Sequence, residues 1–144
     1  MKKIFLVIIL FPLLGFSQYA LVDFIALNDG SEEDYHKLEK VWKVYHQKSI
    51  EAGEKSGWAV WKRTPKDNDG EFAADYVVFN QFASKEQMEN WMKNFDLKKA
   101  VSSMKSGLKG KMSSRAINKI VDNGPNIKKQ VRTYTIELLD ATPW

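Results

Sequence analysis

A long amphipathic segment from Ser31 to Gly57 constrains the fold of this chain more than any other feature. Its apolar and small side chains recur at three- and four-residue steps, the spacing of one helix face, at Tyr35, Leu38, Val41, Trp42, Tyr45, Ser49 and Ala52. Ser31 followed by Asp34 resembles a capping box, and Gly53 weakens the far end. The sequence therefore predicts one long helix over residues 31–57.

Strand-like segments precede and follow this helix. Short runs rich in β-branched and aromatic residues, bounded by turn residues, occupy 19–27, 58–63, 75–82 and 131–138. Ser84, with Gln87 three residues later, predicts the start of a second helix. The order strand, helix, strand, strand, helix, strand is that of a ferredoxin-like α+β fold. We expect a four-stranded antiparallel sheet with both helices on one face.

The segment 98–126 is longer than a minimal version of this fold needs. Its apolar residues keep helical spacing, so we expect one or two helices that are interrupted near Gly107 and Gly110. Residues 98–132 include ten lysine and arginine residues and one acidic residue, Asp122. A solvated lysine-rich helix face explains this charge, and contact with an anionic ligand, polysaccharide or membrane surface is the alternative.

Apolar residues alternate onto both faces of the predicted sheet. In the strand 75–82, Tyr76 and Val78 point one way while Val77 and Phe79 point the other. A face of this kind that no helix covers usually marks an interface. The sequence therefore predicts a homodimer that forms through the open sheet face, as a dimeric α/β barrel.

The first seventeen residues have the pattern of a secretory signal peptide. Lys2 and Lys3 precede an apolar run from residue 4 to 14, and small residues lead to a cleavage site after Ser17. The run is shorter than the roughly 17 residues that a membrane span needs, so we expect no transmembrane anchor after cleavage. These features predict export to the periplasm or the cell exterior, with residues 18–144 as a single domain.

The composition excludes several kinds of site. The chain has no cysteine, which rules out disulfides and thiolate ligands. His36 and His46 are ten residues apart on one predicted helix and form no metal-binding pattern, so we expect no metal and no cofactor. The basic segment carries no interleaved aromatic residues for base stacking, and with export this argues against nucleic acid as a partner.

With its element order, most of the chain after residue 17 resembles the dimeric α/β barrel superfamily, which includes antibiotic-biosynthesis-type and heme-degrading monooxygenases. The resemblance is carried by residues 82–88, FASKEQM, with Trp91 and then Leu97-Lys98-Lys99-Ala100. These residues look like the family's strand exit, its following helix with an inward tryptophan, and a short amphipathic continuation. The resemblance implies the fold rather than an activity.

The heme-degrading branch of that superfamily uses an asparagine, a tryptophan and a histidine. Asn28 matches the asparagine, whereas Phe82 stands at the tryptophan position and Val101 at the position of the axial histidine. The resemblance therefore implies no heme in this chain.

His46 is the candidate catalytic residue, as a general base within a pocket between the long helix and the sheet. It shares the apolar helix face with Trp42, and the alternative is a hydrogen-bonded packing histidine. The candidate ligand-binding residues have aromatic side chains or side chains that both donate and accept hydrogen bonds: Asn28, Trp42, Tyr45, His46, Trp61, Tyr76 and Asn80. Such aromatic residues also serve as ordinary core or dimer interface.

Three functional hypotheses follow from these residues. The first is an exported protein that binds a small apolar or aromatic molecule, because no complete catalytic set is present. The second is a cofactor-independent monooxygenase-like enzyme, in which the pocket orients the substrate and excludes water. The third is a structural or protein-interaction module without a ligand.

Overall fold

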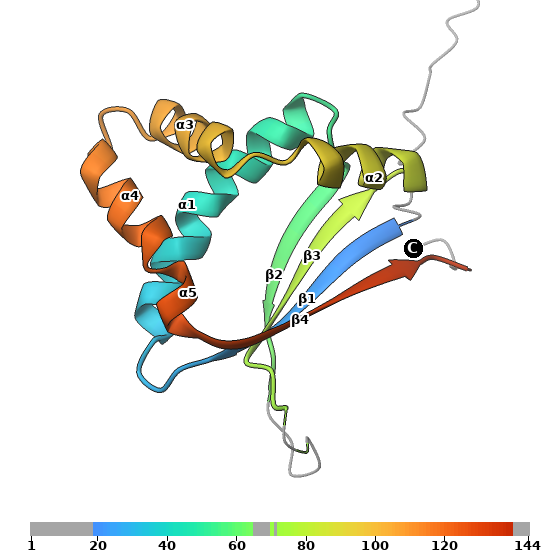
Figure 1. The fold of residues 1–144 in the computed structure, drawn as a ribbon, viewed down its shortest axis with the longest axis horizontal. Helices are drawn as coiled ribbons and strands as arrows, with labels where there is room; N and C mark the ends of the chain where they lie inside the picture. The colour runs from blue at the N-terminus through green and yellow to red at the C-terminus, as the bar shows by residue number, and fades with distance from the viewer. Residues whose placement is uncertain (1–18, 65–69, 71, 140–144) are drawn as a thin grey trace, which may run out of the picture.

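The computed structural model of this protein describes residues 19–64, 70 and 72–139. Figure 1 shows a single sheet with the helices gathered on one side of it. The elements are β1 (Tyr19–Leu27), α1 (Glu32–Glu51), β2 (Gly57–Lys62), β3 (Tyr76–Phe82), α2 (Lys85–Asn94), α3 (Leu97–Gly107), α4 (Ser114–Asp122), α5 (Gly124–Ile127) and β4 (Lys128–Glu137).

The sheet has four strands in the order β2-β3-β1-β4, and each neighbouring pair is antiparallel. Val78 of β3 pairs with Asp23 of β1 and with Val60 of β2. The two central strands are therefore the first and third in sequence, as in a ferredoxin-like fold. The predicted α+β class and sheet are confirmed.

Helix α1 is shorter than the sequence predicted, at 20 residues. It begins at Glu32, but the Ser31 side chain makes no capping hydrogen bond, so the predicted capping box is wrong. Gly53 has φ +73°, a left-handed conformation that favours glycine, and the chain leaves the helix there.

Helix α2 begins with the capping residues that the sequence indicated. The Ser84 hydroxyl oxygen accepts a hydrogen bond of 3.1 Å from the Gln87 backbone N–H. The Gln87 side-chain oxygen in turn accepts one of 2.7 Å from the Ala83 backbone N–H. These two bonds satisfy donors at the open end of the helix and fix where it leaves β3.

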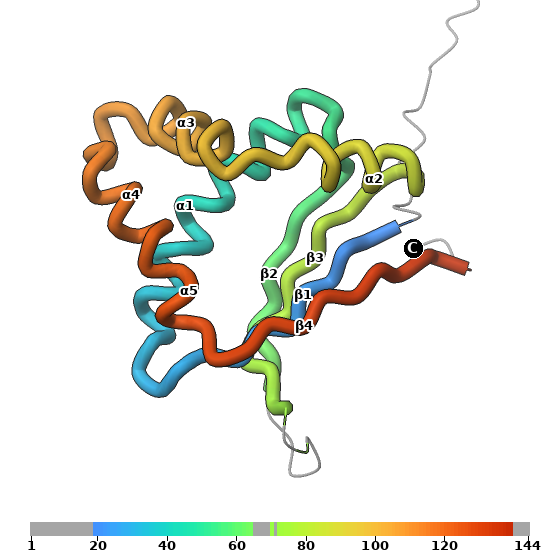
Figure 2. Tube along the Cα trace, in the orientation of Figure 1, coloured from blue at the N-terminus to red at the C-terminus, as the bar shows by residue number. Residues whose placement is uncertain are grey.

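The basic segment forms three helices, which Figure 2 shows as an arch from α2 around α1 to β4. The predicted interruption near Gly107 and Gly110 is confirmed, but the expected number of one or two helices is wrong, because α5 adds a turn after α4. Gly110 has φ +79°, which allows the chain to turn between α3 and α4.

The core lies on the helix-covered face of the sheet. One cluster joins α1 and α5 to the sheet through Tyr35, Leu38, Ile127 and strand residues. A second joins α1 to α3 and α4 through Val41, Met104 and Ile117. No helix within the described residues is both long and apolar enough to cross a membrane.

The other face of the sheet, here called the open face, has no helix over it in Figure 1. Trp61 on β2 remains 64% exposed, and on β4 Tyr134 and Ile136 remain 50% and 46% exposed. Phe24 of β1 packs edge to face against Tyr134, with ring centroids 5.7 Å apart. Within one chain the open face is therefore apolar and only partly covered.

Candidate functional site

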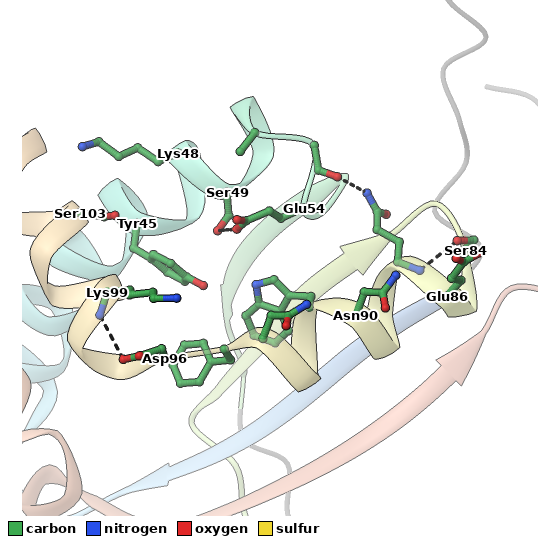
Figure 3. A pocket seen from close by; sticks show the side chains of 16 residues that line it. Tyr45, Lys48, Ser49, Glu54, Ser84, Glu86, Asn90, Asp96, Lys99 and Ser103 are labelled. Atoms are coloured by element: carbon green, nitrogen blue, oxygen red, sulfur yellow. Dashed lines mark hydrogen bonds between the residues drawn. The ribbon is translucent and has the colours of Figure 1, made fainter.

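A groove of about 640 Å³ lies between the C-terminal part of α1 and the α2–α3 region (Figure 3). Tyr45, Trp91 and Phe95 give it aromatic walls. Ser49, Asn90, Asn94, Glu54, Lys48 and Lys99 are among its polar lining residues. Tyr45 points from α1 into the groove in Figure 3. Its volume suits a small organic molecule, for which protein pockets usually measure about 300 to 1,000 Å³.

Hydrogen bonds hold the turn after α1 against α2. The Ser49 hydroxyl donates to a Glu54 carboxylate oxygen at 2.6 Å. The Gln87 side-chain amide donates to the Gly53 carbonyl at 2.8 Å, as the dashed line in Figure 3 shows. The same Gln87 also takes part in the cap of α2. The Gln87–Gly53 bond therefore ties the two walls of the groove together, and the Ser49–Glu54 bond holds the turn to α1.

A buried polar cluster of Lys55, His46 and Asn80 lies behind the groove. Lys55 is only 1% exposed, and His46 and Asn80 are buried as well. Its ammonium donates to Asn80 Oδ1 at 2.7 Å and lies 3.0 Å from His46 Nδ1. A charged lysine can only donate, so Nδ1 is then the acceptor and the imidazole proton is on Nε2.

Aromatic rings enclose this cluster. The His46 ring lies between two indoles, with centroid distances of 4.8 Å to Trp58 and 5.8 Å to Trp42. The Lys55 nitrogen lies over the ring of Trp91, 4.0 Å from its centroid. Trp91 therefore separates the ammonium from the groove that it also lines.

Burial lowers the pKa of both titratable side chains in the buried polar cluster, His46 and Lys55. Desolvation, together with the nearby Lys55 charge, lowers the pKa of His46 to about 2. Desolvation lowers the pKa of Lys55 to about 7, while Glu54 and Asp23 act weakly in the opposite direction. His46 is thus neutral at ordinary pH, and its proposed role as a general base stays a prediction.

The predicted ligand-binding residues fall into three places. Tyr45 lines the groove, and Trp42, His46 and Asn80 belong to the packed interior behind it. Side chains fill the space between α1 and the sheet where the sequence placed a pocket. Trp61 lies on the open face, and Asn28 and Tyr76 lie at the opposite end of the molecule, in a smaller cavity.

That smaller cavity measures about 260 Å³ and is bounded by the β1–α1 turn and the ends of β2 and β3. The Tyr76 hydroxyl donates to Glu32 Oε1 at 2.8 Å and lies 2.7 Å from His36 Nε2. Lys62 also binds Glu32, at 2.5 Å. Asn28 donates to the Asn126 carbonyl at 2.8 Å. The polar groups here satisfy one another.

Sequence reasoning missed Lys55 as a site residue. It lies in a turn between Gly53 and Gly57, where a lysine is ordinarily solvated, and no motif surrounds it. Trp91 was identified only as an inward helix residue, and Phe95 was not identified at all. The spacing of Trp91 and Phe95 on neighbouring turns was the one available signal for an aromatic wall.

No group of three or more His, Asp or Glu side chains within residues 19–64, 70 and 72–139 is arranged to hold a metal ion. The absence of cysteine removes thiolate ligands from the whole sequence. The groove offers aromatic surfaces, amides, hydroxyls, amines and the carboxylates of Glu54, Glu86 and Asp96.

No protein-family model and no curated protein matches this sequence. A crystal structure of an Arabidopsis thaliana protein matches 87% of this chain and 99% of its own at 11% identity, with a TM-score of 0.52. A solution structure of the same Arabidopsis protein, there described as hypothetical, matches 89% of this chain and 94% of its own at 12% identity, with a TM-score of 0.51.

A further match is a protein of Jannaschia sp. CCS1, described as dimeric, ferredoxin-like and of unknown function. It has 8% identity over 83% of this chain and 98% of its own, with a TM-score of 0.49. The Arabidopsis matches support the fold at identities that say nothing about activity. Together with the strand order, they confirm the ferredoxin-like fold that the sequence predicts.

Proposed function

We propose that this chain is a binding protein for a small aromatic or apolar molecule, which it holds in the groove between α1 and α2–α3. The observation that carries the proposal is the groove's combination of volume and lining. About 640 Å³ of space has three aromatic walls and several amide and hydroxyl groups around them. Pockets of this kind bind the apolar body of a ligand and orient it with a few polar contacts.

The groove proposal is tested by titrating benzyl alcohol and 2-naphthol into the isotopically labelled protein and following amide chemical shifts. We expect the shifts to concentrate on α1 after Tyr45, on α2 and on the start of α3. Phe95→Ala should weaken binding about ten-fold, equal to about 1.4 kcal/mol. Met92→Ala is the matched control, since Met92 is 44% exposed against 42% for Phe95 but does not line the groove.

Equal loss of affinity in both variants would assign the effect to α2 stability rather than to ring contact. Shifts spread evenly over the surface, or confined to the open face, would contradict a groove site. In the second case the open face itself would be the apolar surface that the probes detect.

We further propose that two copies associate through their open faces. An exposed apolar patch of this extent on a sheet usually marks an interface, and a second copy buries the same residues on both sides. The patch spans all four strands, with Trp61 on β2, Val77 and Phe79 on β3, Phe24 on β1, and Tyr134 and Ile136 on β4. The groove lies on the helix side, so dimerisation leaves it accessible.

Export is part of this proposal and rests on the sequence alone. Residues 1–17, which lie outside the described residues, have the charge and hydropathy order of a signal peptide. N-terminal sequencing of the protein from periplasmic and culture fractions should give Gln18 as the first residue. Recovery of the chain with Met1 in the cytoplasmic fraction would contradict export.

A further inference from the structure

Lys55 occupies an unusual position for a lysine. Its side chain is almost completely buried, and within the described residues it forms no ion pair. Its two hydrogen-bond partners, His46 and Asn80, are neutral. A buried ammonium without a carboxylate partner is costly, so the neutral amine becomes accessible near neutral pH.

The nitrogen has one tetrahedral position left after its bonds to Cε, His46 and Asn80. The ring of Trp91, at 4.0 Å, takes the remaining side. In the neutral amine that position holds the lone pair. Trp91 also lines the groove, so the lone pair is separated from the groove by the thickness of one indole ring.

Trp91 lacks a polar anchor within the part of the chain that the structure describes. Its Nε1–H is buried and donates no hydrogen bond there. Besides Lys55, Trp91 contacts the rings of Phe82 and Phe95, each at a centroid distance of 5.6 Å. Rotation of Trp91 toward the groove therefore breaks no hydrogen bond and lets its N–H reach solvent.

We propose that Lys55 captures an aldehyde or ketone group of an aromatic molecule in the groove as an imine, when Trp91 turns aside. This inference rests on the groove of the proposed function and adds the chemical class of its ligand. The apolar body of the ligand lies against Tyr45 and Phe95, and its carbonyl carbon reaches Nζ.

The reaction needs no oxidant, reductant or metal. The Nζ lone pair forms a bond to the carbonyl carbon, and the C=O π pair moves to the oxygen. A proton passes from nitrogen to that oxygen through solvent in the groove, which gives a carbinolamine. The hydroxyl group then takes up one further proton and leaves as water, which gives the C=N bond of a protonated imine.

The groups in direct contact with Lys55 carry no charge of their own. His46 from α1 is uncharged, and Asn80 and Phe82 from β3 and Trp91 from α2 do not titrate. Glu54 in the turn and Asp23 on β1 favour the ammonium, but desolvation outweighs them and lowers the pKa of Lys55 to about 7. An ordinary lysine, with a pKa near 10.4, is neutral in fewer than about one molecule in a thousand at pH 7.

The test is reductive trapping of the mature protein with benzaldehyde and sodium cyanoborohydride at pH 7, followed by peptide mass spectrometry. Lys48 and Lys99 line the groove directly and are internal references with freer access to the probe than Lys55. We expect Lys55 to acquire a benzyl group at least ten-fold faster than either. Trp91→Ala should speed the labelling of Lys55 several-fold, whereas Trp91→Phe, which keeps a ring, should change it less.

The inference is overturned if Lys48 and Lys99 are labelled while Lys55 stays unmodified in the wild type. Peptide mapping of the wild type needs no variant, so a folding defect cannot hide the answer. A parallel titration with benzyl alcohol, which lacks the carbonyl, separates the two proposals. Binding of benzyl alcohol without labelling of Lys55 removes the imine and leaves the groove, and absence of both removes both.

Discussion

The two faces of this sheet are built from the same strands and differ in what covers them. On the helix-covered face, alternate residues of β3 such as Tyr76, Val78 and Phe82 are buried by the helices. On the open face, the intervening Val77 and Phe79 are only half-buried. The comparison teaches that a strand with apolar residues on both faces needs a cover on each face. The helices of this chain cover one of them.

The largest expected effect is a difference in stability between two substitutions on β3, one on each face of the sheet. Phe82→Ala removes a fully buried ring from the covered face and should lower the free energy of unfolding by about 3 to 5 kcal/mol. Phe79→Ala on the open face should cost less, and its cost should grow with protein concentration if a second copy covers it. Urea denaturation at two protein concentrations measures the loss of stability in each variant. Equal losses that do not depend on protein concentration would contradict a difference in covering between the two faces.

The next effect concerns the covering of the open face. Trp61→Asp places a charge where we expect the second copy to pack, and should weaken the dimer by about 2 kcal/mol, or roughly thirty-fold in Kd. Sedimentation equilibrium measures this, with Leu97→Asp on α3 as a control of comparable exposure. A wild-type monomer at micromolar concentration would contradict the dimer outright.

The covered face also carries a buried lysine, Lys55, whose ammonium donates to Asn80 of β3. Lys55 has a folded pKa of about 7, below its ordinary 10.5, so between these values the unfolded chain holds a proton that the folded chain lacks. Stability should therefore rise with pH from 7 to about 10, by up to about 1.4 kcal/mol per unit. Lys55→Met should remove the rise.

Lys85→Met, which changes an exposed lysine at the start of α2, is the control and should keep the rise. Urea unfolding at a series of pH values measures both variants. A slope that persists in Lys55→Met would show that another group causes it and that Lys55 is not neutral near pH 7.

The smallest effect tests how firmly α2 is held over the covered face. Ser84→Ala removes the acceptor for the Gln87 N–H and should cost about 1 kcal/mol. Ser31→Ala is the matched control at α1, where the serine side chain makes no capping bond, and should cost much less. Thermal unfolding of both variants decides whether the two serines differ as the structure indicates.

Much of the fold was predictable because its signals are local. The period-two runs gave β1 at residues 19–27 and β3 within one residue, and Ser84 with Gln87 placed the start of α2. Ser31 with Asp34 carried a similar pattern, yet it forms no cap because the backbone at Ser31, with φ −89° and ψ 2°, does not take the extended conformation of a capping residue.

The candidate site was less predictable because it depends on distant side chains. Trp42, His46 and Asn80 were expected to line a pocket, but their rings and amide fill the space between α1 and the sheet. The groove instead opens between α1 and α2–α3, where Tyr45 faces Trp91 and Phe95 across elements far apart in sequence. Side-chain volumes at a packed interface decide this, and hydropathy does not encode them.

The sequence by itself determined the element order, the ferredoxin-like topology, the apolar character of both sheet faces and the absence of thiol chemistry. Each of these follows from the spacing or the presence of residue types along the chain. Only the tertiary structure decided that Lys55 is buried against His46, Asn80 and Trp91. A lysine in a turn is normally solvated, and only the packing of a turn, a strand and a helix around it removes the water that keeps it charged.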